Sequence, residues 1–430
     1  MANVKASFES ALKPMKPMHG VGQPPIAGTD FSRFRYLKDA GIPFSRLHDV
    51  AGYFGEYRFV DVPNLFRDFD ADENDPENYD FVFTDMLISA LMESGVEPFF
   101  RLGVTIENFH AIKYYRLAPP KDFGKWARIC EHVIRHYTEG WANGFHYPIR
   151  YWEIWNEPDD YYAEENAMWK GTKEQFYEFY TVAARHLKAC FPLLKIGGYG
   201  ACGFYRISGE KSQSKLEIEK KDYFLNFFHE ILSRIKETGS TLDFFSFHSY
   251  DYPENIAEQA AYARRALDEA GFADTELFLT EWNCYSPARG TLRHASLTAH
   301  ALVCFQNSPL DGAMFYDARF GIGQYAGMFN PETGKPYPAY YAFTAFNRLY
   351  KLHKQAEASC DDERICVLAA ADGDRGALML VNTTPDPLPF TLSLDREISH
   401  VLVTGDGLRD TEMPLPEEIE GYGIITVLCE

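Results

Sequence analysis

The chain alternates between two hydrophobic patterns from about residue 20 to residue 350. Short apolar segments predict β-strands, and longer segments with apolar residues on one face at a period of 3.6 predict α-helices. The strands are expected over residues 19–22, 43–48, 97–103, 150–156, 194–199, 243–248, 276–281 and 312–317. The clearest helical faces lie within residues 123–137, 176–187 and 224–235. The pattern therefore predicts eight consecutive strand–helix units.

Strands that alternate with helices form parallel sheets with right-handed crossovers. Eight such units in one stretch fit a closed (β/α)8 TIM barrel better than an open, doubly wound sheet. After residue 352 the pattern changes to short strands separated by Gly, Pro and Asp turns, which predicts a small C-terminal antiparallel β-sandwich. We therefore expect an α/β fold with a barrel domain over residues 1–352 and an accessory β domain over residues 353–430.

Composition and charge exclude several classes of protein. Hydrophobic residues make up 46% of the chain and charged residues 24%, which is typical of a globular protein and not of a disordered one. A net charge of −20 argues against nucleic acid or an anionic membrane as a partner. The chain lacks an apolar stretch typical of a secretory signal or a membrane span, and its eight cysteines form no C-x-x-C pair. A cytoplasmic location with mainly free thiols is expected.

Polar residues end several of the predicted strands, where the active sites of such barrels lie. They are Arg46, His48, Arg101, Asn156, Glu157, His248, Tyr250, Glu281, Asp317 and Arg319. Glu157 ends the fourth strand and Glu281 ends the seventh, so the two acids are expected to face a shared cleft. A salt bridge at the rim would explain either acid alone, but the sequence Trp-Asn-Glu-Pro followed three units later by Thr-Glu-Trp-Asn favours a working pair.

Two carboxylates across a cleft suit the cleavage of a glycosidic bond. One must protonate the leaving oxygen, and the other must attack the anomeric carbon as a carboxylate. Trp152 and Trp155 are expected to desolvate Glu157 and raise its pKa, while Arg46 or Tyr250 would keep Glu281 charged.

The sequences EIWNEPD (153–159) and FLTEWN (278–283) resemble the paired signatures of retaining glycoside hydrolases of clan A. The resemblance is closest to glycoside hydrolase family 39, the β-xylosidase and α-L-iduronidase family. Further similarity lies in FSRLH (44–48), in residues 79–103, in the stretch from residue 126 to residue 152 and in FHSY (247–250). It extends over most of the barrel.

The resemblance implies roles for individual residues. Glu157 matches the general acid/base and Glu281 the nucleophile, which implies retention through a covalent glycosyl-enzyme. The residues implied to contact the sugar at subsite −1 are Asn156, which would hold the 2-hydroxyl, and His48, His248 and Tyr250. Arg46, Asp317 and Arg319 are added as further candidates for substrate binding.

Three positions depart from the family pattern. Asp49 stands where the family commonly has Gly, Val104-Thr105 replaces the usual Met-Pro, and FYDARFGIG (315–323) replaces a Trp-rich segment. These positions are expected to line the sugar pocket, so the sequence specifies the identity of the sugar less closely than it specifies the reaction. Arg319 could bind a uronic carboxylate, although a structural pair with Asp317 is the favoured interpretation.

Two other motifs are set aside. Residues 198–203 spell G-x-G-x-x-G, but a long polar stretch follows where a dinucleotide site needs a helix, which argues against an oxidoreductase. The segment from Asp70 to Phe81 begins like a calcium loop but lacks its Gly and its final Glu, so a solvated acidic loop is expected.

The sequence therefore predicts a cytoplasmic retaining exo-glycosidase, most simply a β-xylosidase, acting on small oligosaccharides or glycosides. A β-glucosidase, a β-galactosidase or a hydrolase of uronic or arabinosyl units remains open within the class. A carbohydrate-binding protein without turnover would usually have lost one of the two acids. No metal and no organic cofactor is expected, because both proton transfer and attack come from carboxylates. The outer helix faces and the β domain leave room for a homo-oligomer.

Overall fold

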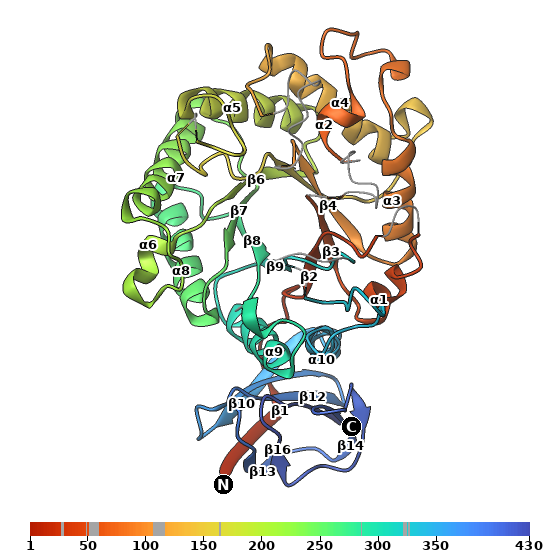
Figure 1. Cartoon of the computed structure of the whole chain (residues 1–430), viewed down its shortest axis with the longest axis vertical. Helices are drawn as coiled ribbons and strands as arrows, with labels where there is room; N and C mark the ends of the chain where they lie inside the picture. Colours follow the sequence, from red (N-terminus) through yellow and green to blue (C-terminus); the bar gives the residue numbers. More distant parts are fainter. Residues whose placement is uncertain are drawn as a thin grey trace.

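The computed structural model describes residues 1–26, 30–48, 50, 60–105, 117–162, 165–284, 286–320, 325 and 327–430. It consists of a closed barrel of parallel strands surrounded by helices and a smaller β domain packed on one side (Figure 1). The α/β barrel predicted from the sequence is thus confirmed. Asp49 and residues 321–323, two of the departures from the family pattern, lie outside the described residues.

The barrel strands occur where the apolar segments predicted them. They are β2 (Gly20–Gly22), β3 (Phe44–Leu47), β4 (Glu97–Leu102), β5 (Tyr151–Ile154), β6 (Lys195–Ala201), β7 (Phe244–Ser249), β8 (Glu276–Trp282) and β9 (Gly312–Phe315). They follow one another in sequence order, and β9 closes the ring by pairing in parallel with β2.

Helices cover the outside of the barrel (Figure 1). In the described chain they are α1 (Phe34–Asp39), α2 (Val62–Leu65), α3 (Val82–Glu93), α4 (Phe123–Thr138), α5 (Lys173–Cys190), α6 (Tyr205–Ser208), α7 (Ile218–Thr238), α8 (Pro253–Ala270), α9 (Leu292–Gln306) and α10 (Tyr340–Tyr350). Short 3-10 turns occupy Pro76–Asn78, Trp141–Asn143, Gly209–Lys211 and Ser286–Ala288. The polar stretch 209–222, which follows the G-x-G-x-x-G segment, contains one of these turns and the start of α7.

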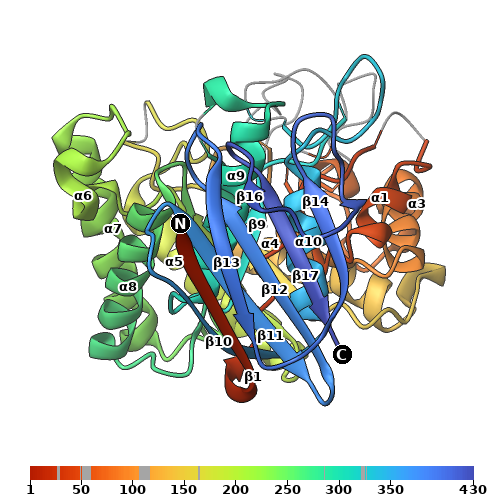
Figure 2. The ribbon, with the colours of Figure 1, turned by 90° about the horizontal axis from the view of Figure 1, so that it is seen from below.

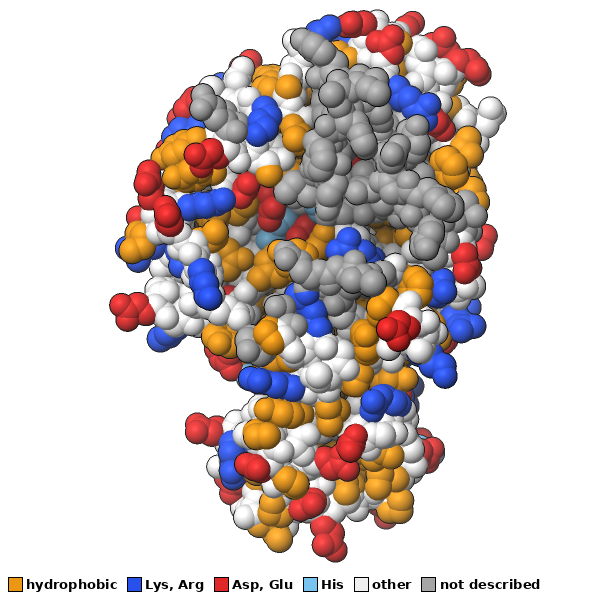
Figure 3. Space-filling model, in the orientation of Figure 1, with side chains coloured by type: hydrophobic (Ala, Val, Ile, Leu, Met, Phe, Trp, Pro, Cys, Tyr) orange, Lys and Arg blue, Asp and Glu red, His pale blue; other side chains and the backbone are white. Residues whose placement is uncertain are grey.

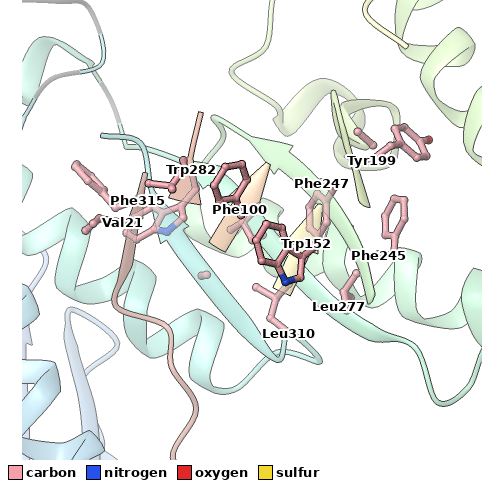
Figure 4. Packing of buried hydrophobic residues seen from close by; sticks show 14 of the residues in the cluster. Val21, Phe100, Trp152, Tyr199, Phe245, Phe247, Leu277, Trp282, Leu310 and Phe315 are labelled. Atoms are coloured by element: carbon pink, nitrogen blue, oxygen red, sulfur yellow. The ribbon is translucent and has the colours of Figure 1, made fainter. Parts of the chain in front are cut away.

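Alternate residues of each barrel strand point inward, which stacks the interior in layers. The lowest layer is a cluster of apolar side chains made of Phe44, Phe99, Tyr151, Phe244, Phe278 and Met314. Two residues further along their strands come Arg46, Glu153 and Ser246, which are buried as well. The neighbouring residues Phe100 and Trp152 instead pack between the strands and the helices (Figure 4). The apolar layer therefore closes the barrel beneath a polar one.

The smaller domain is a nine-stranded sheet in the order β15-β14-β17-β12-β11-β10-β1-β13-β16. Its strands are β1 (Ala2–Pro14), β10 (Lys354–Cys360), β11 (Ile365–Asp372), β12 (Arg375–Asn382), β13 (Leu388–Leu394), β14 (Ile398–Thr404), β15 (Thr411–Glu412), β16 (Glu418–Ile419) and β17 (Ile424–Cys429). Strands near the two ends of this order, β14 and β13, contribute to one hydrophobic core. The sheet therefore curls around its own core.

The first strand corrects the expected domain organisation. β1 pairs antiparallel with β10 and parallel with β13 (Figure 2), so residues 2–14 lie in the accessory sheet although the sequence assigned 1–352 to the barrel. The sheet is consequently mixed, and not purely antiparallel. Alternate residues Ala2, Val4, Ala6 and Phe8 are buried in the second core, which is the period of a half-buried strand.

The accessory sheet is attached to the barrel through buried apolar side chains. Leu368 on β11 and Met379 on β12 belong to the same core cluster as the barrel and its helices α9 and α10. Within the described residues, no helix combines the length and the apolar character that crossing a bilayer requires.

Candidate active site

Arg46 organises the polar layer above the barrel floor. It is buried and donates from Nε to Glu153 Oε2 at 2.6 Å, from Nη1 to Glu281 Oε1 at 2.7 Å and from Nη2 to Asn156 Oδ1 at 2.6 Å. A guanidinium group can hold several acceptors at fixed angles, so one side chain from β3 positions residues of β5 and β8. Glu153 was not among the expected site residues, although a charged residue inside the apolar strand YWEI was the signal for it.

Glu281 is held at both of its carboxylate oxygens. Oε1 accepts from Arg46, and Oε2 accepts from the hydroxyl of Tyr250 at 2.6 Å. Burial, the largest influence, raises the pKa of Glu281; the neighbouring His248 ring, the Arg46 charge and the Tyr250 hydrogen bond oppose this rise, whereas the nearby Glu157 adds to it. The expected contacts with Arg46 and Tyr250 are present, but burial outweighs them and the pKa lies above that of an ordinary glutamate.

Glu157 follows β5 and is fixed by its backbone. Its φ angle is +45°, and its N–H donates to the carbonyl of Gly200 at 2.9 Å. Its Oε1 lies 2.7 Å from Nδ1 of His248, whose Nε2 lies 3.7 Å from Glu281 Oε1. Burial lowers the pKa of His248 to about 4, so the imidazole is neutral at neutral pH. A neutral ring thus lies between the two acids, with one nitrogen facing each.

The two acids predicted from the sequence meet at the barrel mouth. Ligand atoms of Glu157, His248 and Glu281 all lie within 4.8 Å of one another. His48 is buried, and its Nε2 lies 3.9 Å from Glu281 Oε1. Figure 3 shows acidic and histidine side chains together in the hollow at the centre of this face. Arg46, Asn156 and Tyr250 join the same network through the hydrogen bonds described above.

Asp317 and Arg319 form their own pair after β9. Arg319 Nε lies 3.1 Å from Asp317 Oδ2, and the backbone N–H of Arg319 donates to Asp317 Oδ1 at 3.1 Å. The structural pairing favoured by the sequence is therefore confirmed. The Arg319 guanidinium thus lies beside the carboxylate of Asp317, whereas the alternative interpretation had it bind a uronic carboxylate of the substrate.

Arg101, another polar residue at a strand end, has a structural contact. It donates to the buried Asp61 at 2.7 Å, and Asp61 also accepts from the N–H of Thr105 at 2.9 Å. The Val104-Thr105 departure from the family pattern thus supplies a partner to a buried carboxylate.

The tryptophans beside Glu157 differ from expectation. Trp155 packs against Trp126, Trp169 and Phe179 on the helix side of β5, and Trp152 stacks on Phe100. These rings fill the layer between strands and helices, whereas the side chain bonded to the Glu157 carboxylate is His248.

Asp159 is a buried residue of the site that sequence reasoning missed. Both of its oxygens accept from the N–H of Cys202, at 3.1 and 3.2 Å, which ties the loop after β5 to the end of β6. Burial raises the pKa of Asp159 from an ordinary 3.8 to about 8. Its place two residues after Glu157 in the motif was the available signal.

The glycines of the G-x-G-x-x-G segment make room for the site. Gly200 has a φ of +63°, and a Cβ there would lie 3.1 Å from Arg46 Nη2 and 3.2 Å from His248 Nε2. A side chain at this position would press on both groups. Gly200 is therefore explained by the close approach of the backbone to Arg46 and His248.

Among the described residues, three groups have the side-chain types and spacing to hold a metal ion. They are Glu157/His248/Glu281, Glu131/His186/Cys190 and Glu254/His300/Cys304. In the first group, both Glu281 oxygens already accept from Arg46 and Tyr250. That arrangement suits a carboxylate nucleophile better than a metal ligand.

Comparison with known proteins agrees with this geometry. A sequence model of glycosyl hydrolases family 39 matches residues 61–385. The chain is 24% identical over 365 residues to a β-xylosidase of Geobacillus stearothermophilus, which covers 74% of this chain and 62% of that protein. It is 26% identical over 229 residues to a β-xylosidase of Caldicellulosiruptor saccharolyticus, which covers 48% and 41%. The chain thus spans less than two thirds of the length of these curated relatives.

Solved structures share the whole architecture. A glucosidase from Croceicoccus marinus superposes with a TM-score of 0.81 at 20% identity over 100% of this chain and 99% of that one. A family 39 β-xylosidase from Caulobacter crescentus does so with a TM-score of 0.69 at 18% identity over 99% of each chain. At these identities the likeness concerns the fold. Because the family model matches well over half of the sequence, this chain belongs to glycosyl hydrolases family 39.

Proposed function

We propose that the protein is a retaining exo-glycosidase that hydrolyses β-glycosides, with β-xylosides as its preferred substrates. The observation that carries this proposal is the meeting of Glu157 and Glu281, whose nearest oxygens lie within 4.8 Å at the mouth of the barrel. Retaining glycosidases place their carboxyl groups about 5–5.5 Å apart, whereas inverting enzymes need roughly 6.5–9.5 Å to admit a water molecule. The short spacing supports retention.

In the first step, Glu157 gives its proton to the glycosidic oxygen while the bond from that oxygen to the anomeric carbon breaks. A carboxylate oxygen of Glu281 forms the new bond to the anomeric carbon, and the leaving alcohol departs. Arg46 and Tyr250 hold the two oxygens of Glu281, so the nucleophile is oriented before substrate arrives.

In the second step, the Glu157 carboxylate removes a proton from water, and the water oxygen attacks the anomeric carbon. Glu281 leaves as a carboxylate, and Glu157 regains its proton, so the enzyme returns to its starting state. A hydrogen bond donated by His248 Nδ1 to Glu157 Oε1 would leave Glu157 Oε2 as the oxygen that carries the proton for the leaving group.

The sugar is proposed from the relatives and from the site. Two curated relatives are named as β-xylosidases, which supports xylose, whereas a structural relative is named as a glucosidase, which keeps glucose as the alternative. The Arg319–Asp317 pair gives no support to a uronic substrate.

A screen of aryl glycosides that differ in sugar and anomer tests the activity. We expect turnover of aryl β-xylosides, with the β-anomer of the free sugar appearing first by NMR. Release of the α-anomer first would contradict retention. Binding of sugars without turnover of any substrate would favour a carbohydrate-binding protein.

Two variants test the assignment of the acids. Glu281→Ala should abolish turnover, and azide should restore it with formation of the inverted glycosyl azide. Glu157→Gln should lower turnover most for substrates with poor leaving groups, because these depend on protonation. Near-normal rates in Glu281→Ala would show that the nucleophile is a different residue.

A further inference from the structure

A cluster of tyrosines lies where the loop that carries Glu157 meets α7. The ring of Tyr161 lies 4.5 Å from that of Tyr162, and Tyr162 lies 4.9 Å from Tyr223 at the start of α7. Tyr162 is 50% exposed, while the other two rings are partly buried. Most aromatic side chains among the described residues are buried, so three touching tyrosines that reach the solvent call for a reason.

The loop beneath these rings is fixed by hydrogen bonds. The Asp160 N–H donates to the carbonyl of Glu157 at 3.2 Å, and the buried Asn166 donates from Nδ2 to the carbonyls of Pro158 at 2.7 Å and Tyr161 at 3.1 Å. The tyrosines are therefore held in a set position relative to the acid.

Lys220 places this cluster at the Glu157 end of the site. Its ammonium group lies 5.5 Å from the centre of the Tyr161 ring and 2.9 Å from Asp160 Oδ1. The same group interacts electrostatically with Glu157. The general acid protonates the leaving oxygen, so the leaving group must lie on its side of the cleft.

We propose that Tyr161, Tyr162 and Tyr223 bind the leaving-group sugars of an oligosaccharide substrate. Sugar rings present flat C–H faces that pack on aromatic rings, and the tyrosine hydroxyls can bond to sugar hydroxyls at the edge. This inference rests on the proposed glycosidase function and specifies its substrate as an oligosaccharide chain longer than the sugar at subsite −1. The cluster contributes to chain-length preference and takes no part in bond cleavage.

The test compares two substrates that share the same −1 sugar. β-D-xylosyl fluoride has a single fluoride as its leaving group and cannot reach the tyrosines, whereas xylotetraose extends a chain of sugars past Glu157. Tyr162→Ala should lower kcat/KM for xylotetraose by about two- to tenfold, since one stacked ring contributes at that level. It should leave kcat/KM for the fluoride unchanged, and Tyr162→Phe should keep most of the wild-type rate on both.

Phe83→Ala is a matched control, because Phe83 is 45% exposed on α3, across the barrel from α7 in Figure 1. It should change neither rate. The inference is overturned if Tyr162→Ala lowers kcat/KM for both substrates by the same factor, which would indicate damage to the Glu157 loop. The inference is also overturned if Tyr162→Ala keeps the wild-type kcat/KM for both substrates. A wild-type protein inactive on the fluoride and on all aryl glycosides would overturn the glycosidase proposal as well.

Discussion

At the scale of single residues, Arg46 connects the chemistry to the scaffold. It bonds to Glu281, which is proposed to attack the sugar, and to Glu153, which is buried inside β5. Removing one partner of a buried ion pair leaves an uncompensated charge and costs about 3–5 kcal/mol. The position of the nucleophile and the stability of the barrel thus depend on one guanidinium group.

Tyr250→Phe tests how the Glu281 charge is maintained. The Tyr250 hydroxyl donates to Glu281 Oε2 at 2.6 Å and stabilises the carboxylate, so its loss should raise the already elevated pKa of Glu281 further. Attack requires the ionised form, so the acidic limb of the kcat/KM profile should move to higher pH by about one unit. Tyr252→Phe, which alters an exposed ring two residues along, should leave the profile in place. An unmoved limb in Tyr250→Phe would show that this hydrogen bond does not set the ionisation.

Asp159→Asn tests the buried carboxyl next to the acid. Folding raises the pKa of Asp159 from 3.8 to about 8, so the folded state holds the proton more tightly. The stability that this group contributes is therefore complete below pH 3.8 and decreases as the pH rises to about 8. Because Asn cannot ionise, the melting temperature of Asp159→Asn relative to wild type should increase between pH 5 and pH 8 and then level off.

The control for that series is Asp374→Asn, which changes an exposed carboxylate between β11 and β12. The difference in melting temperature between Asp374→Asn and wild type should stay nearly constant with pH. A constant difference for Asp159→Asn as well would mean that Asp159 is ionised in the folded protein.

At the scale of elements, the strands of the barrel were predictable and β1 was not. The barrel strands are continuous apolar segments followed by helices of period 3.6, a local pattern that survives without knowledge of the partners. β1 carries the alternating residues Ala2, Val4, Ala6 and Phe8, a pattern typical of a half-buried strand that does not indicate which sheet the strand joins. Its partners β10 and β13 lie more than 300 residues away, and no local pattern encodes such pairing.

Phe8→Ala tests the contribution of β1 to the accessory sheet. Phe8 is buried in the second core, and truncation of a buried Phe costs about 3–5 kcal/mol. We expect a clear loss in the free energy of unfolding measured with urea. Lys5→Ala, on the exposed face of the same strand, should have little effect. Equal effects of the two changes would argue against the observed register of β1.

The site shows a similar division between local and distant information. Glu157 and Glu281 were predictable because each ends an apolar strand in a distinctive motif. The bond between Arg46 and Glu153 was not, because it depends on which residues of two strands share an inward layer. The expected role of Trp155 failed for the same reason: the residue is adjacent to the site in sequence, but its ring faces the helices.

At the scale of the whole molecule, the two cores are joined through the face of the accessory sheet that packs on α9 and α10. We therefore expect the barrel and the accessory domain to unfold together, in one calorimetric transition. Met379→Ala, which removes a buried side chain from this contact, should lower the temperature of that single transition. Ile398→Ala, at an exposed apolar position of the same sheet, should lower it much less. Two separate transitions in the wild type would contradict this coupling.

The placement of β1 has a consequence for how the protein is made. The ribosome synthesises this strand before the barrel, but its two neighbours, β10 and β13, emerge only after the barrel is complete. At about 5–20 residues per second, the strand waits roughly 20 to 80 seconds for both partners. Throughout that interval the nascent chain carries a strand with one apolar face and two unpaired edges, which makes it a natural substrate for chaperones that act during translation.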